Sequence, residues 1–198
     1  MSKAKPFIKW VGGKTQLIEQ LDAQLPADFG NWENVTYIEP FVGGGAMLFY
    51  MLQRYPNIQN AVINDINSDL TTCYRTVRDN PEELIASLQD IQKEYNALQT
   101  EEARKEFFLA VRARYNEKNL APIENTTKFF FLNRTCFNGL YRVNKRGLFN
   151  VPFGKYTNPQ ICDPITIRKD SELLQRVEIM TGDFEETFGH AVGNTLFY

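Results

Sequence analysis

The chain has 198 residues, a net charge of −2 and 43% hydrophobic residues, with 15 Phe and 9 Tyr among its aromatic residues. This length allows one main domain with a smaller inserted lobe, and this composition excludes the disordered and collagen-like classes. Charged residues such as Lys9 and Glu19 interrupt the N-terminal apolar positions, so the sequence predicts neither a signal peptide nor a membrane span, and we expect a cytoplasmic protein.

Few residues of this chain are suited to bind a transition metal or to form disulfides. Cys73, Cys136 and Cys162 are far apart and form no Cys-x-x-Cys spacing, and the single histidine is His190. An odd number of scattered cysteines does not indicate a disulfide framework, and one histidine does not indicate a zinc site. We therefore expect no metal.

The N-terminal region predicts a loop that leads into a helix. Residues 7–11 are a short β-prone run that ends at Gly12-Gly13, and the apolar residues of 15–21 have helical spacing. A phosphate-binding loop that ended in Gly13-Lys14-Thr15 would need glycine at position 8, which is Ile. An NTPase is therefore not favoured.

A buried strand at residues 35–38 is followed by Glu39, a turn that contains Gly43-Gly44-Gly45, and a helix predicted at 46–55. Glycines let the backbone approach a ligand closely, and the amides at the start of the helix suit a polar or anionic group. The dinucleotide fingerprint would need Gly or Ala where Leu48 stands, so a dinucleotide enzyme is not favoured. We expect a pocket for another nucleotide-type cofactor, with Glu39 at the end of the strand.

A second strand at residues 61–63 ends in Asn64-Asp65. The order of strand, glycine turn, helix, strand and acid is the start of a doubly wound sheet, in which such an acid commonly meets ribose hydroxyls. Alternatively, Asp65 forms a turn before an N-cap for a helix at 70–78. The preceding glycine turn, at the right separation, favours the functional interpretation.

Residues 70–120 predict helices, and their apolar stripes predict a core in a lobe inserted after the second strand. Asn80-Pro81-Glu82-Glu83 predicts a capping box with proline at the first helical position. Residues 128–132 predict a buried element that leads into a basic segment. Further on, residues 177–180 predict a strand that ends before Asp183-Phe184, and residues 194–198 begin another strand.

Basic residues are concentrated in one part of the chain. Residues 125–162 contain six Lys and Arg residues and no acid, which leaves 16 basic and 24 acidic residues elsewhere. Residues 140–144 and 148–152 flank Lys145-Arg146-Gly147, a pattern that predicts a β-hairpin with a basic tip. This asymmetry is expected of a polyanion contact, with a solvated basic hairpin as the alternative.

Five blocks of residues occur in order along the chain. They are Lys9-Trp10-Val11-Gly12-Gly13-Lys14, Glu39-Pro40-Phe41-Val42-Gly43-Gly44-Gly45, Asn64-Asp65-Ile66-Asn67-Ser68-Asp69-Leu70, Asn133-Arg134-Thr135-Cys136-Phe137-Asn138-Gly139-Leu140-Tyr141-Arg142 and Asn150-Val151-Pro152-Phe153-Gly154. Each block alone is a weak signal, but five in this order are specific. Over residues 7–198 the chain resembles the DNA adenine methyltransferase (Dam) family.

The resemblance implies an α/β, Rossmann-like fold that binds S-adenosylmethionine and that is incomplete at the C-terminus. It implies a cofactor-binding core in residues 1–70 and 171–198, with a helical and β-hairpin target-recognition lobe at residues 71–170. The expected substrate is double-stranded DNA whose adenine, within GATC, is flipped out and methylated on N6. The enzyme would act as a monomer, either in a restriction–modification system or alone.

The resemblance also assigns site residues. A sulfonium, an ammonium and a diol need hydrogen-bond acceptors or negative charge, and adenine needs an aromatic face. The residues that match the family's cofactor contacts are Trp10, Gly12, Lys14, Glu39, Pro40, Phe41, Gly43, Gly45, Asp65, Asp183 and Phe184. An arginine can form hydrogen bonds to guanine, and an inserted aromatic side chain offsets the free-energy cost of unstacking the bases. The residues that match the family's DNA contacts are Arg134, Phe137, Asn138, Leu140, Arg142, Lys145, Arg146, Pro152 and Tyr156.

One family motif is absent. Asp-Pro-Pro-Tyr is expected after the strand that starts at Thr195, and the sequence ends at Tyr198. That motif accepts hydrogen bonds from the adenine amino group and stacks on the flipped base, so we expect the 198 residues alone to be inactive. The alternatives are a non-enzymatic module that binds DNA or S-adenosylmethionine, and a methyltransferase that acts on RNA or a small molecule.

Overall fold

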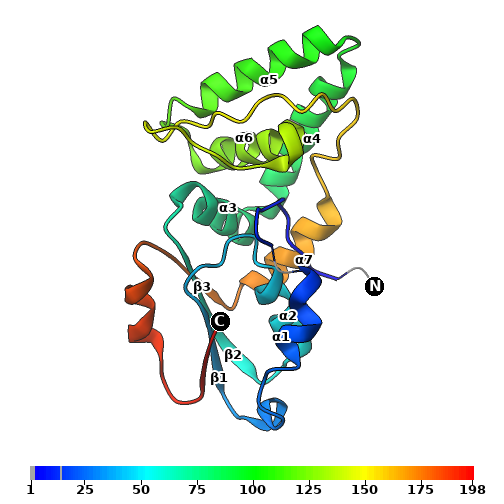
Figure 1. Cartoon of the computed structure of the whole chain (residues 1–198). Helices are drawn as coiled ribbons and strands as arrows, with labels where there is room; N and C mark the ends of the chain where they lie inside the picture. Colours follow the sequence, from blue (N-terminus) through cyan, green and yellow to red (C-terminus); the bar gives the residue numbers. More distant parts are fainter. Residues whose placement is uncertain (1–2, 14) are drawn as a thin grey trace.

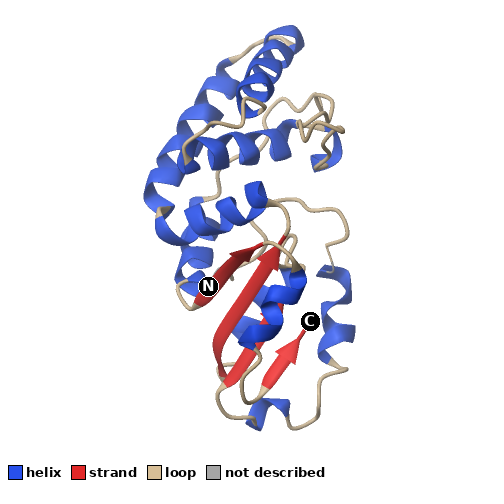
Figure 2. Ribbon diagram, turned by 90° about the vertical axis from the view of Figure 1, so that its left-hand side faces the viewer, coloured by secondary structure: helices blue, strands red, loops and turns tan. Residues whose placement is uncertain are grey.

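The computed structural model describes residues 3–13 and 15–198. Within them, four strands form a parallel sheet in the order β3-β2-β1-β4. Helices connect these strands (Figure 2), so the predicted α/β, Rossmann-like fold class is confirmed. The strands are β1 (Val35–Glu39), β2 (Ile58–Asp65), β3 (Val177–Thr181) and β4 (Thr195–Phe197).

The helices divide between the sheet and a lobe. In Figure 1, α4, α5 and α6 lie apart from the sheet, and α3 and α7 lie between. The helices are α1 (Ile18–Asp22), α2 (Ala46–Arg54), α3 (Ser68–Asp79), α4 (Pro81–Ala97), α5 (Glu101–Tyr115), α6 (Pro122–Thr135) and α7 (Pro164–Leu174), and short 3₁₀ turns occupy Thr15–Leu17, Phe29–Asn31, Phe137–Gly139 and Phe184–His190. Because α3 packs against both β3 and α6, the predicted division after residue 70 stays a prediction.

The apolar patterns explain these elements. All five residues of β1 are buried, as expected of a strand inside a parallel sheet. The stripe predicted for α4 is its buried face, made by Leu84, Ile85, Leu88, Ile91 and Tyr95. One hydrophobic core runs from the sheet into the lobe. None of the helices in the described part of the chain is both long enough and apolar enough to cross a bilayer.

The β-prone run at residues 7–11 forms no strand and belongs to the loop that leads into α1, so the predicted loop and helix are confirmed. The backbone of this segment bonds to side chains instead: Asn133 Oδ1 accepts from Lys9 N at 2.8 Å, and Asn133 Nδ2 donates to Lys9 O at 2.8 Å. Asp170 likewise accepts from Lys5 N at 3.1 Å. These bonds place the segment across α6 and α7 instead of beside the sheet.

Two local expectations change. The predicted capping box is wrong, although Pro81 does start α4: the Asn80 side chain makes no cap hydrogen bond, and Asn80 N donates to Thr76 O at 2.9 Å and so is not free for Glu83. Residues 128–132 lie within α6. The hairpin is present, but it consists of a single antiparallel bridge, Val143 to Phe149, with a turn closed by Gly147 N and Asn144 O at 2.9 Å.

Asp69, in the first turn of α3, links the sheet region to the lobe. Its Oδ2 accepts from the Tyr115 hydroxyl and from Lys118 Nζ, both at 2.6 Å, and the Tyr141 hydroxyl lies at 3.4 Å. Burial raises the pKa of Asp69, but hydrogen bonds from Lys118 and Tyr115 outweigh burial and hold the pKa below its ordinary value. The ionised carboxylate therefore stabilises the folded state.

Replacing Asp69 with Ala is expected to lower the free energy of unfolding by about 2–3 kcal/mol, because the buried Tyr115 hydroxyl and the Lys118 ammonium lose a charged acceptor. Urea unfolding at neutral pH measures this loss. Since the folded pKa is depressed, the contribution is present above the ordinary pKa of an aspartate and is lost as pH falls through the folded value. The difference between wild type and Asp69→Ala should therefore shrink in acid.

Glu172→Ala is the matched control, because Glu172 forms an exposed ion pair with Lys169 at 2.7 Å. Loss of such a pair is expected to change stability by only about 0.5 kcal/mol. Equal losses in the two variants would show that Asp69 does not tie α3 to the lobe.

Candidate functional site

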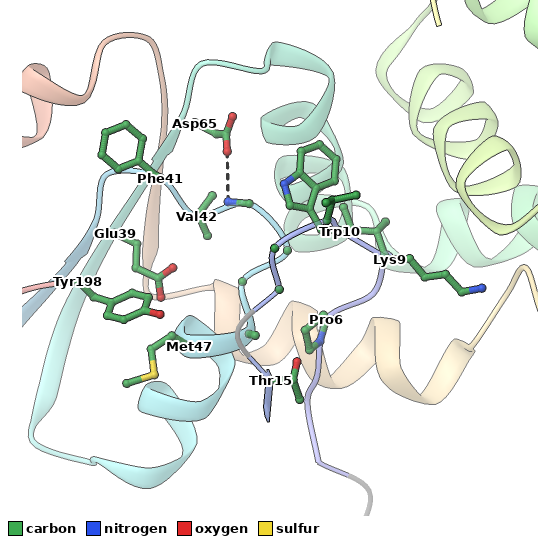
Figure 3. Close-up of a pocket in the computed structure, with 18 of the residues that line it drawn as sticks. Pro6, Lys9, Trp10, Thr15, Glu39, Phe41, Val42, Met47, Asp65 and Tyr198 are labelled. Carbon is green, nitrogen blue, oxygen red and sulfur yellow. Dashed lines mark hydrogen bonds between the residues drawn. The ribbon is translucent and has the colours of Figure 1, made fainter. Parts of the chain in front are cut away.

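A cavity of about 760 Å³ lies at the carboxyl edge of the sheet. β1 and β2 are parallel neighbours, and Glu39 pairs with Ile63, so Glu39 and Asp65 end their strands at the same edge. This is where open α/β sheets bind ligands. Figure 3 shows Glu39, Tyr198 and Met47 on one side of the cavity and Trp10 on another. Seven of the residues predicted to bind the cofactor line it, namely Trp10, Gly12, Glu39, Phe41, Gly43, Gly45 and Asp65.

The glycine turn is held between two aromatic side chains. A Cβ atom on Gly43 would lie 2.9 Å from Trp10 Cδ1, and a Cβ atom on Gly45 would lie 2.4 Å from the Tyr74 hydroxyl. Gly43 and Gly45 have φ values of +50° and +71°, in the left-handed region that favours glycine. The Tyr74 hydroxyl donates to Gly43 O at 2.9 Å. The turn therefore brings bare backbone to the cavity wall.

Glu39 places a carboxyl group in the cavity wall with only 2% of its surface exposed. Its Oε1 accepts from the Tyr37 hydroxyl at 2.6 Å. Burial raises the pKa of Glu39 to about 8, and the Tyr37 hydrogen bond opposes this rise only in part. The group is therefore protonated at neutral pH, and a bound cation would favour its ionised form.

Asp65 forms the turn that the sequence offered as one interpretation, and it also lies at the cavity, as the other interpretation requires. Its Oδ2 accepts from Gly43 N at 3.1 Å, the bond drawn in Figure 3, and its Oδ1 accepts from Asn67 N at 2.9 Å. Asn67 in turn caps α3. Asp65 thus forms the turn and also lines the cavity, and each carboxylate oxygen can accept a further hydrogen bond.

Three further predicted cofactor residues do not line the cavity. Pro40 is buried beside the turn, and Asp183 is exposed, where it accepts from Glu185 N at 2.9 Å. Phe184 does not line the cavity but packs on Phe41, with ring centroids 5.3 Å apart. Lys14 lies outside the described residues. The proposed contacts of these four residues with the cofactor stay predictions.

Sequence reasoning missed several residues of this site. Tyr37 could have been found, because it stands two positions before Glu39 and shares its face of the strand. Tyr74 could not, because no local pattern shows that α3 passes behind the glycine turn. The cavity is also lined by Lys9, Val11, Gly13, Thr15, Met47 and Tyr198, together with Pro6, Ile8, Leu21, Val42, Gly44 and Ala46.

The lining fits the cofactor that the resemblance implies. Two carboxyl groups can accept from an ammonium and a diol, bare backbone lies close to the cavity, and aromatic faces are present. The volume falls within the range of about 300–1,000 Å³ usual for small-molecule sites. Within residues 3–13 and 15–198, no three His, Cys, Asp or Glu side chains cluster as metal ligands.

Residues 137–156, here named the recognition segment, form a second surface. Phe137 is 52% exposed, and Asn138 follows with φ +54°. Phe137 N donates to Pro152 O at 2.9 Å, which brings these two predicted DNA residues together. Leu140 is partly buried against the core. An exposed aromatic ring and an exposed amide thus stand side by side on a tight turn.

Arg142 is held in place by its neighbour across the hairpin. Its Nε donates to Asn150 Oδ1 at 2.7 Å and its Nη2 donates to Asn150 O at 3.2 Å. Lys145 and Arg146 are exposed in the turn of the same hairpin. The Tyr156 ring lies under Lys9 Nζ, 5.4 Å from the nitrogen. The hairpin therefore presents three basic side chains, one of them with a fixed guanidinium.

The other basic residues of segment 125–162 do not join this group. Arg134 is partly buried and donates to Phe7 O at 2.8 Å, Lys155 pairs with Glu101 at 2.7 Å, and Lys128 lies 3.4 Å from Glu124. The local excess of charge is therefore spread over several surfaces, and whether Arg134 contacts DNA stays a prediction.

Comparison with known proteins places the chain in a family. Residues 10–198 match the model of the D12 class N6 adenine-specific DNA methyltransferases. The chain is 46% identical to type II methyltransferase M.MjaIII of Methanocaldococcus jannaschii over 185 residues, which cover 92% of this chain and 63% of that protein. It is 38% identical to type II methyltransferase M1.LlaDCHI of Lactococcus lactis subsp. cremoris, covering 98% of this chain and 64% of the relative.

A third relative is the DNA adenine methylase of Vibrio cholerae, which is 32% identical over the whole chain and over 65% of its own length. The chain thus spans slightly less than two thirds of the length of these relatives. The family match covers most of the cavity lining and the whole recognition segment. This chain belongs to the D12 class of N6 adenine-specific DNA methyltransferases.

Proposed function

We propose that this chain provides the cofactor site and the target-recognition surface of an enzyme that methylates adenine N6 in DNA. The observation that carries the proposal is the meeting of Glu39, Asp65 and the glycine turn in one cavity. Family membership supplies the reaction class. A cytoplasmic location and a monomeric state are part of this proposal.

S-Adenosylmethionine, when bound, supplies an electrophilic methyl group. Ionised Glu39 accepts from the ammonium of the cofactor, and Asp65 accepts from its ribose hydroxyls without releasing the glycine turn. Trp10 and Phe41 cover the ligand and exclude water. Asp183 and Phe184 hold the adenine end, and Lys14 contributes from the N-terminal loop.

The proposed substrate is duplex DNA with GATC as the target. Phe137 and Asn138 enter the base stack beside the adenine, which lowers the free-energy cost of flipping it out. Arg142, oriented by Asn150, reads guanine, while Lys145 and Arg146 contact phosphates, which position the duplex without specifying its sequence. Two relatives are named type II methyltransferases, which supports a role in restriction–modification.

Binding of S-adenosylhomocysteine tests the cofactor site. Because Glu39 is protonated below a pKa of about 8, its proton must leave when the ligand ammonium binds, so acid weakens binding. Calorimetry should show that affinity rises about tenfold from pH 6 to pH 7, a range in which an α-ammonium with a pKa of about 7.7–8.0 stays mostly charged.

Glu39→Gln is the matched variant, because glutamine has the shape of the protonated acid. It should fold, bind weakly and lose the pH dependence. Asp65→Ala should weaken binding by about tenfold or more, since hydrogen bonds to a charged group are lost. Unchanged affinity in both variants would place the cofactor elsewhere.

Two arginine substitutions test the recognition surface. Arg142→Ala should reduce discrimination between GATC and scrambled duplexes by about 1–3 kcal/mol, because one base contact is lost. Arg146→Ala should weaken all duplexes alike and reduce the slope of log affinity against log salt by about one. Titrations at several salt concentrations separate the two effects. A uniform loss in both variants would contradict the assignment of Arg142 to guanine.

The 198 residues contain no Asp-Pro-Pro-Tyr. We expect them, on their own, to bind S-adenosylhomocysteine and transfer no methyl group, because no carboxylate and carbonyl of that motif orient the adenine amino group. Incubation with methyl-labelled S-adenosylmethionine and a GATC duplex measures transfer. Label in the DNA would refute this expectation, while absence of both binding and transfer would refute the proposed cofactor site.

A further inference from the structure

Tyr141 joins the recognition segment to the wall of the cofactor cavity. Its ring stacks on Trp10 with centroids 5.3 Å apart and planes 26° apart. Trp10 lines the cavity, and its side chain also contacts the glycine turn, since Cβ atoms on Gly43 and Gly44 would lie 2.9 Å and 3.0 Å from it. The indole is thus shared by the cavity, the turn and the recognition segment.

Tyr141 has no part in the proposed contacts with cofactor or bases. It does not line the cavity, and it is partly buried against Phe129 and Phe149, with centroids 5.4 Å and 6.0 Å away. Its hydroxyl lies 3.4 Å from Asp69 Oδ2. Packed on these sides, the ring has few positions open to it.

The neighbours of Tyr141 in the chain are the proposed readers of DNA. Leu140 and Arg142 are covalently attached on either side, so the packing that fixes Tyr141 also limits the positions of both neighbours. On the other side of the stack, residues 9–13 have no strand partners and are held through side chains such as Asn133. A ligand that packs on Trp10 therefore restricts the Trp10–Tyr141 stack, and this stack also holds the recognition segment in place.

We propose that Tyr141 is a positioning residue that makes cofactor and DNA strengthen each other's binding. This inference rests on the proposed function. Whichever ligand binds first orders the Trp10–Tyr141 stack, so the second binds without that cost. Linkage requires the effect to be reciprocal, with one factor for both ligands.

Asn133 offers a competing route between the same two regions. It is only 3% exposed and bonds to both Lys9 N and Lys9 O at 2.8 Å, and its Nδ2 also donates to Gly139 O at 3.1 Å. This route consists of hydrogen bonds and does not involve the Trp10–Tyr141 stack. Coupling through Asn133 would survive loss of the Tyr141 ring, so the two routes give different results.

The test uses the 198-residue chain, S-adenosylhomocysteine and a duplex with one GATC. The dissociation constant of each ligand is measured with and without saturating amounts of the other. In wild type, each ligand should tighten the other by the same factor. Tyr141→Leu should reduce this factor about fivefold, the size of one aromatic contact. Affinity for S-adenosylhomocysteine alone should change little.

Tyr141→Phe is the matched control. It keeps the ring and lacks only the hydroxyl near Asp69, so it should retain the coupling factor of wild type. If Tyr141→Leu does not fold, Tyr141→Met fills a similar volume without a ring and takes its place.

Distinct outcomes overturn the inference and the proposed function. Normal binding of each ligand with a wild-type coupling factor of one overturns the inference alone. The same holds if the factor is unchanged in Tyr141→Leu, which would favour the Asn133 route, or if Tyr141→Phe loses as much as Tyr141→Leu. Failure of wild type to bind either ligand by itself overturns the proposed function, and the inference with it.

Discussion

The close approach of Trp10 to Gly43 and Gly44 is the contact on which the site depends. It exists because these two positions carry no Cβ, and a methyl group at either would lie about 3 Å from the indole side chain. The contact lets residues 3–13, which form no strand, serve as one wall of the cavity. The same indole ring also stacks on Tyr141.

The burial of Glu39 opposes the ionisation of its carboxyl group. An acid with a pKa of about 8 inside a parallel sheet carries a proton that it would release in water at neutral pH. The Tyr37 hydroxyl satisfies one oxygen but does not restore the charge. A buried acid with a raised pKa is typical of functional sites, where the folded state gives up some stability in order to bind a ligand.

Much of the fold followed from sequence because its signals are local. Buried runs predicted β1, β2 and β3, and the glycine turn with Asp65 predicted the cavity edge. Other features depended on residues far apart in the chain. Glu82 pairs with Arg168, and Asn133 holds residues 7–11 away from the sheet. All charged residues of segment 125–162 are basic. Its sequence does not show that Arg134 bonds to Phe7 or that Lys155 pairs with Glu101.

The start of α3 links the cavity to the lobe. Asp65 ends β2 at the cavity, Asn67 caps the helix, and Asp69 in its first turn binds Tyr115 and Lys118 at the edge of the lobe. Five residues therefore contain both the acid of the cavity and the anchor of the lobe. Because the lobe follows this helix in the chain, the Asp65 turn is joined to the lobe covalently through α3. A second connection runs through space, since Asp65 bonds to Gly43 N, Gly43 packs on Trp10, and Trp10 stacks on Tyr141.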